Sequence, residues 1–173
     1  MNTLVITGCQ RSGTGYVSVV LSAAGHWCGH ERHYRIETRR APKLPVIEAS
    51  HMAVPLLTDE IVAWQIRHPL AVANSMMARG TIRPRRPSRL PPSGRWTLEQ
   101  LPHVATEPTH VERCLRYWHD WNRRVQGHAD TVWRVEDLTI DDLARALELS
   151  GRDPNRDRIA QALKDAMKSK EQD

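Results

Sequence analysis

The chain has 173 residues, with 40% hydrophobic and 26% charged residues, a formal net charge of +5 and three cysteines. These values are typical of one soluble globular domain spanning residues 1–173. No apolar run approaches the roughly 20 residues of a membrane span, no leader sequence is recognisable, and sparse cysteines without a CxxC motif predict a cytoplasmic protein without disulfides.

The positive charge suits an anionic ligand, and no motif for specific nucleic-acid recognition accompanies it. One sparse cluster could suggest a metal, namely Cys28, His30 and His33. No second cluster with ligand spacing completes it, so no metal is expected.

A strand, a glycine-rich turn and a helix are predicted at the start of the chain. The apolar run 4–7 predicts a buried parallel strand, and apolar residues spaced along 17–24 predict a helix that ends at Gly25. The segment between them contains Gly8, Gly13 and Gly15. Glycines let a backbone approach an anion, and the first N–H groups of a helix point at it, so this segment predicts a phosphate-binding loop.

The loop differs from a Walker A sequence. A Walker A loop has Lys directly after its second conserved glycine, whereas Gly13 is followed by Thr14 and the cation is Arg11. The lysine reaches the β- and γ-phosphates, so its absence argues against an ATP or GTP hydrolase.

The segment 26–34 is predicted as a loop or a short edge strand that could return towards the ligand. His30 is a base near neutral pH and Glu31 is a carboxylate, so both are candidates for proton transfer. The alternative is a solvated charged loop.

A second buried strand, 61–66, delivers Arg67 at its carboxyl end, where open α/β sheets bind ligands. A helix with body 70–79 follows, with Pro69 at its first position and Ser75 inside it. Arg67 could instead form a surface ion pair, and Ser75 could bond to a carbonyl of its own helix. Three elements are expected before this strand: an exposed basic connection (35–44), a short strand (46–50) and a short helix (52–57).

Residues 80–108 are rich in Pro and Arg and predict a long loop or lid, with one short helical turn near Thr97. The remaining elements expected are a helix over 110–126 behind a Thr109–Glu112 capping box, a strand over 131–135, a helix after Thr139, and a last helix after Pro154 with a frayed tail from Lys168. This alternation predicts an α/β fold with a mostly parallel central sheet and helices on both faces.

Two motifs, in this order, resemble those of sulfotransferases that use 3′-phosphoadenosine 5′-phosphosulfate (PAPS). Arg11-Ser12-Gly13-Thr14 is similar to their 5′-phosphosulfate loop. Arg67-His68-Pro69 followed by Ser75 resembles their 3′-phosphate motif, with His68 where the family usually has Asp. A weaker resemblance to small bacterial and phage sulfotransferase-like proteins covers most of the chain outside 80–108. It lies in Gly29-His30-Glu31, in Glu48-Ala49-Ser50 followed by Ala53-Val54-Pro55, in Tyr117-Trp118 with Trp121-Asn122, and in Arg134–Leu138.

The resemblance implies a P-loop-type three-layer fold and transfer of a sulfuryl group to an acceptor hydroxyl or amine, releasing adenosine 3′,5′-bisphosphate (PAP). Arg67 and Ser75 are expected to hold the 3′-phosphate, and Arg11 to neutralise the phosphosulfate. Glu31 is the expected general base, with its pKa raised by burial or with a mainly orienting role. His30 is the second candidate. The cofactor cradle is expected to include Gln10, Arg11, Ser12, Gly13, Thr14, Gly15 and Tyr16.

The expected acceptor is a small molecule or glycan-like group, without a membrane partner, and a homo-oligomer is compatible with the sequence. Two other functions fit parts of the pattern. One is a catalytically silent PAP- or nucleotide-binding protein. The other is a P-loop small-molecule kinase, against which the missing loop lysine argues.

Overall fold

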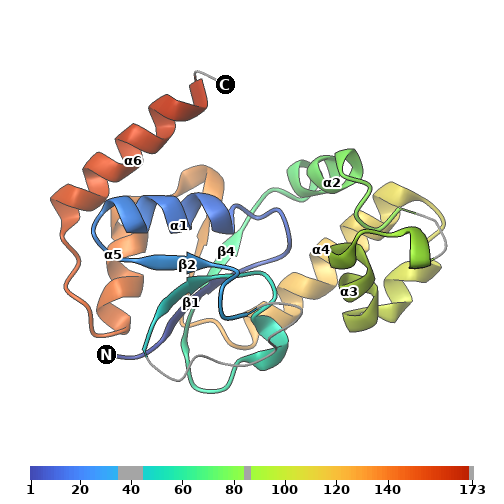
Figure 1. Ribbon diagram of the computed structural model, residues 1–173, viewed down its shortest axis with the longest axis horizontal. Coiled ribbons are helices and arrows are strands. Elements are labelled where there is room, and N and C mark those ends of the chain that lie inside the picture. Colours follow the sequence, from blue (N-terminus) through green and yellow to red (C-terminus); the bar gives the residue numbers. More distant parts are fainter. Residues whose placement is uncertain (35–44, 84–86, 172–173) are drawn as a thin grey trace.

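The computed structural model describes residues 1–34, 45–83 and 87–171. Its centre is a five-stranded, all-parallel sheet in the order β2–β3–β1–β4–β5 (Figure 1). The strands are β1 (Leu4–Thr7), β2 (Cys28–His30), β3 (Ile47–Ala49), β4 (Ile61–Ile66) and β5 (Thr131–Arg134). The helices of the described residues are α1 (Thr14–Ala23), α2 (Pro69–Ala78), α3 (Pro92–Gln100), α4 (His110–Gln126), α5 (Ile140–Leu149) and α6 (Arg156–Glu171). The predicted α/β class with a parallel sheet is confirmed.

The first strand lies at the centre of this sheet. Val5 is paired in register with Glu48 of β3 on one side and with Val62 of β4 on the other. The chain therefore builds β2 and β3 on one side of β1 and then β4 and β5 on the other. Such a reversal leaves a crevice at the carboxyl ends of the central strands, which is where open α/β sheets bind ligands.

Helices cover both faces of the sheet. Alternate residues of β1 point to opposite faces, so each face has its own set of packing partners. Leu4 and Ile6 are fully buried in a core that they share with α1, α5 and α6. A second core lies among α2, α3 and α4, and the fully buried Trp121 is part of it. Figure 1 shows α1, α5 and α6 grouped at one side of the sheet and α2, α3 and α4 at the other.

The Pro- and Arg-rich segment differs from the predicted long loop. It contains the nine-residue helix α3 and two 3-10 turns, η2 (Pro87–Arg89) and η3 (Pro102–Thr106). Trp96, Leu101 and Val104 are buried in the second core. Burial of these apolar side chains orders a segment whose composition alone favours a loop.

Smaller differences concern element ends. The short helix expected at 52–57 is the 3-10 turn η1 (Val54–Leu56), and the tail expected to fray from Lys168 is helical through Glu171. The segment 26–34 contains the edge strand β2, whereas the expected basic connection 35–44 lies outside the described residues. None of the helices within the described ranges is long and apolar enough to cross a membrane.

Candidate active site

A cavity of about 480 Å³ opens at the carboxyl ends of the central strands. The loop after β1, the turn after β2, the end of β4 and the start of α3 all contribute to it. Its lining residues are Gln10, Arg11, Gly13, Thr14, Gly15, Tyr16, His30, Glu31, His51, Met52, Arg67 and Ser93. Most of the residues predicted for the site thus meet around one cavity.

The amino-terminal end of α1 faces this cavity without a protein cap. Its N-cap residue, Gly13, has φ 96°, a left-handed conformation that glycine adopts without strain. No side chain caps the helix, and its first turn has no acidic residue, in contrast to the Thr109–Glu112 capping box of α4. The first N–H groups of α1 are therefore available to an anion.

Side chains from α4 and β4 hold the loop backbone in place. The Gln10 N–H donates to the Tyr117 hydroxyl (2.9 Å), and Trp121 Nε1 donates to the Gly8 carbonyl (3.0 Å). Gln65 Nε2 donates to the Ser12 carbonyl (2.7 Å). The loop is thus fixed before any ligand binds, which lowers the entropic cost of binding.

The predicted cations meet at one end of the cavity. Arg11 has φ 71°, and its Nε donates to Ser75 Oγ (2.9 Å), while Arg67 Nη1 donates to the Arg11 carbonyl (3.1 Å). Burial lowers the pKa of Arg11, the nearby charges of Arg79 and Arg67 lower it further, and Glu31 opposes this effect. Crowded cations of this kind favour an anion between them.

Glu31 lies across the cavity and is bound by a histidine that the sequence analysis missed. His51 Nδ1 donates to Glu31 Oε1 (2.6 Å), and the His51 side chain is only 4% exposed. Burial alone would raise the pKa of Glu31, but the hydrogen bond from His51 and the charges of His51, His30 and Arg11 outweigh it and lower the pKa. Of the two alternatives expected for Glu31, the raised pKa is therefore wrong and the mainly orienting role stays a prediction; Glu31 is a carboxylate at neutral pH.

His30 stands at the exposed edge of the cavity. Its side chain is 44% exposed, with Nε2 3.3 Å from Thr14 Oγ1 and 4.0 Å from Glu31 Oε1. The ring also packs over Gly15. His30 therefore lies between the glycine-rich loop and Glu31, within reach of both.

Two predicted residues do not line the cavity. Ser12 is fully buried beneath the loop, and its N–H donates to the Cys9 carbonyl (3.1 Å). Ser75 reaches the site through Arg11. His68, which departs from the family pattern, still caps α2, because its Nδ1 accepts from the Leu70 N–H (3.3 Å).

A buried cysteine, Cys9, also lies in the loop. Burial raises the pKa of its thiol to about 12, so it is a thiol at neutral pH and a poor nucleophile. Within the described parts of the chain, no three or more His, Cys, Asp or Glu side chains are placed to hold a metal ion.

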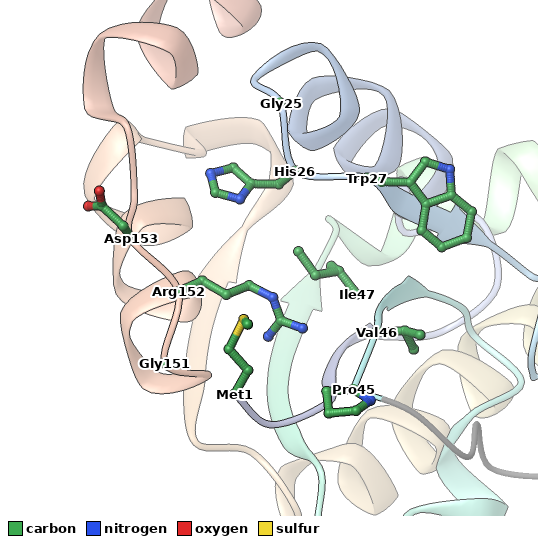
Figure 2. A pocket seen from close by; sticks show the side chains of 10 residues that line it. All are labelled: Met1, Gly25, His26, Trp27, Pro45, Val46, Ile47, Gly151, Arg152 and Asp153. Carbon is green, nitrogen blue, oxygen red and sulfur yellow. The ribbon is translucent and has the colours of Figure 1, made fainter.

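Two further cavities adjoin the sheet. One, of about 750 Å³, lies on the other side of Tyr16, between the segment after β5 and α6, and includes Leu138, Ile140 and Leu163. The other, of about 480 Å³, lies at the amino ends of the strands (Figure 2). There the Arg152 guanidinium already donates to the Asn2 carbonyl (2.7 Å), so this cation has a protein partner.

No protein-family model matches the chain, and no curated protein matches it. The chemistry of the cavity therefore has to be read from its own residues. It combines a glycine-rich loop and clustered arginines at one end with an ionised carboxylate and two histidines at the other.

Proposed function

We propose that this protein is a sulfotransferase that binds PAPS in the cavity and transfers its sulfuryl group to an acceptor hydroxyl or amine. One observation carries the proposal. The two motifs that resemble the phosphosulfate and 3′-phosphate motifs are far apart in the sequence, yet Arg11 of the first contacts both Ser75 and Arg67 of the second.

Glu31 is the proposed contact of the acceptor. In the proposed reaction, the acceptor oxygen or nitrogen forms a bond to sulfur as the bond between sulfur and the phosphate oxygen breaks. The electron pair of that broken bond leaves with PAP, where Arg11 and the N–H groups of α1 stabilise the added negative charge. Glu31 orients the acceptor and takes its proton as the new bond to sulfur makes that proton acidic.

The neighbouring cavity behind Tyr16 supports a nucleotide donor. Tyr16 lines both cavities, so a nucleotide whose phosphates lie on the loop can extend past this ring. Apolar walls such as Leu138 and Leu163 suit a heterocyclic base.

Isothermal titration calorimetry with PAP tests the proposal, with ATP plus magnesium titrated in parallel. We expect PAP to bind and each of Arg11→Ala and Arg67→Ala to weaken binding by about 10- to 100-fold, the effect of losing one or two charge-assisted hydrogen bonds. The matched control is Arg145→Ala, which removes an exposed arginine of α5 and should bind PAP like the wild type.

The outcome also separates the alternatives. PAP binding without transfer from PAPS to any acceptor favours a silent nucleotide-binding protein. Binding of ATP and magnesium in place of PAP favours a kinase, and absence of PAP binding removes the sulfotransferase proposal.

A further inference from the structure

A second glutamate, Glu48, lies buried behind the site. It is on β3, fully buried, and no arginine, lysine or histidine among the described residues forms an ion pair with it. Its Oε1 accepts from the backbone N–H groups of Arg32 and His33, the second at 3.0 Å. Its Oε2 is buried without a hydrogen-bond partner among the described residues. An unpartnered carboxylate oxygen in a core is costly, which calls for an explanation beyond packing.

The two N–H groups belong to the turn that presents Glu31. Glu31 has φ 52°, a left-handed conformation that is unfavourable for a non-glycine residue. Its own N–H donates to the Ala49 carbonyl (3.2 Å), next to Glu48 on β3. The turn is therefore tied to β3 by three hydrogen bonds on consecutive N–H groups, two of which end on Glu48.

The neighbouring strand leaves room for this side chain. Gly29 of β2 is paired with Glu48 in the sheet, and a Cβ atom at Gly29 would lie 2.1 Å from Glu48 Oε2. Any larger residue at this position would displace the carboxylate. The buried carboxylate of Glu48 therefore requires a glycine at position 29.

We propose that Glu48 is a positioning residue, which holds the turn after β2 in the left-handed conformation that brings Glu31 against His51 at the cavity. Glu48 does not touch the cavity itself and acts only through the backbone of Arg32 and His33. The inference rests on the proposed function only in treating Glu31 as the group that meets the acceptor.

The test is the pKa of the Glu31 carboxyl group, measured by carbon-13 NMR in the full chain, with the resonance assigned by its loss in Glu31→Gln. In Glu48→Met the turn loses its acceptor, Glu31 leaves His51, and its pKa should rise. In Glu48→Gln the amide oxygen still accepts both N–H groups, so the pKa of Glu31 should not rise.

The direction in which the pKa of Glu31 changes distinguishes a positioning role of Glu48 from an effect of its charge. Removal of the negative charge of Glu48 alone would lower the pKa of Glu31, in both variants. A pKa in Glu48→Met that is unchanged or lower overturns the inference, and so does a rise of equal size in Glu48→Gln. The matched control is Glu60→Gln, because Glu60 accepts from the Tyr34 hydroxyl (2.8 Å) at the far end of the same segment. It should leave the pKa of Glu31 unchanged.

A measurement on the wild type covers the case in which Glu48→Met does not fold. Amide hydrogen exchange of Arg32 and His33 should be slow, and exchange at the rate of an unstructured peptide overturns the inference. Titration of the same wild-type sample with PAP reports separately on the proposed function. Absence of PAP binding removes the transfer reaction and leaves the role of Glu48 in the turn to be decided by the Glu31 measurement.

Discussion

Glu31 and His51 come from different loops, yet a hydrogen bond of 2.6 Å joins their side chains. A carboxylate with this partner stays ionised when it is partly buried, and it suits orientation of an acceptor better than strong base catalysis. The protonation state of this side chain therefore depends on a neighbour that lies 20 residues away in the sequence.

Removal of the Glu31 charge should affect anion binding in a defined direction. Glu31 interacts favourably with the charge of Arg11, so it competes with a bound anion. We expect Glu31→Gln to bind PAP about two- to threefold more tightly by calorimetry, as for one partly screened charge, and to lose sulfuryl transfer. The control Glu148→Gln changes an exposed glutamate of α5 and should bind PAP like the wild type. Weaker binding in Glu31→Gln would show that Glu31 holds the arginines in place.

The sequence identified the cations and the loop, because these residue types lie next to glycines and strand ends. Two further residues at the site were not predicted, although their positions in the sequence indicate a role there. His51 follows directly after a predicted strand, at the carboxyl end where ligands bind, and Gln65 is a polar residue within a buried apolar run. Tyr117 carried no such signal, since its contact with Gln10 joins segments that only the tertiary structure brings together.

At the level of elements, α4 holds the backbone of the loop between β1 and α1. Tyr117 and Trp121 are one helical turn apart on the same face, and both bind the loop backbone. The helix thus contributes to the core and to the geometry of the anion site at once.

Loss of the Tyr117 hydroxyl should therefore affect both stability and binding. Tyr117→Phe leaves the Gln10 N–H without its acceptor, and we expect a loss of about 1 kcal/mol in the free energy of unfolding together with weaker PAP binding. Urea unfolding and calorimetry measure the two effects. Thr109→Ala is the matched control, because it removes the N-cap of the same helix at a similar cost of about 1 kcal/mol but leaves the loop contacts intact. Equal PAP affinity in the two variants contradicts this assignment.

The elements that were predicted well have a clear local pattern, such as an apolar run or a capping box. The elements that depend on tertiary packing were not predicted well. The buried run 61–66 and the capping box at Thr109 gave β4 and the start of α4 directly. The three-residue strands β2 and β3 are defined by their pairing with each other and with β1. Helix α3 forms where the Pro and Arg content predicts a loop, because Trp96 is buried against Trp121.

At the scale of the whole molecule, an acidic group that joins η3 to α4 should contribute to the loss of stability at low pH. Asp120 accepts from His103 Nε2 and His119 Nδ1, both at 2.7 Å, and pairs with Arg116. Burial alone would raise the pKa of Asp120, but the hydrogen bonds from His103 and His119 and the charge of Arg116 lower it. A group whose pKa is lower in the folded chain stabilises it above the ordinary Asp pKa, and this contribution disappears as pH falls through the folded value.

Asp120→Asn should consequently melt below the wild type at pH 7. The difference in Tm should shrink as the pH falls from about 5 towards 2, because the wild type then loses the same charge. Thermal unfolding over this range measures the effect, with the exposed Asp165→Asn as control. A difference that stays constant with pH contradicts the assignment.

The order of the strands in the sheet was not predicted from the sequence. Alternation of strands and helices predicted a parallel sheet, but no residue pattern in β1 indicates that β3 and β4 flank it. The order follows from which faces pack best once all helices are present, and this is a property of the complete chain.

The central place of β1 has a consequence for how the chain folds. The strands that flank β1 are β3 and β4, which both follow it in the chain, and α1 packs against α6, far away in the sequence. Such long-range pairing makes folding slow, on the millisecond-to-second scale expected for a high contact order. Until these partners are in place, the apolar faces of β1 and α1 stay uncovered, and exposed surface of this kind makes a folding chain prone to aggregation.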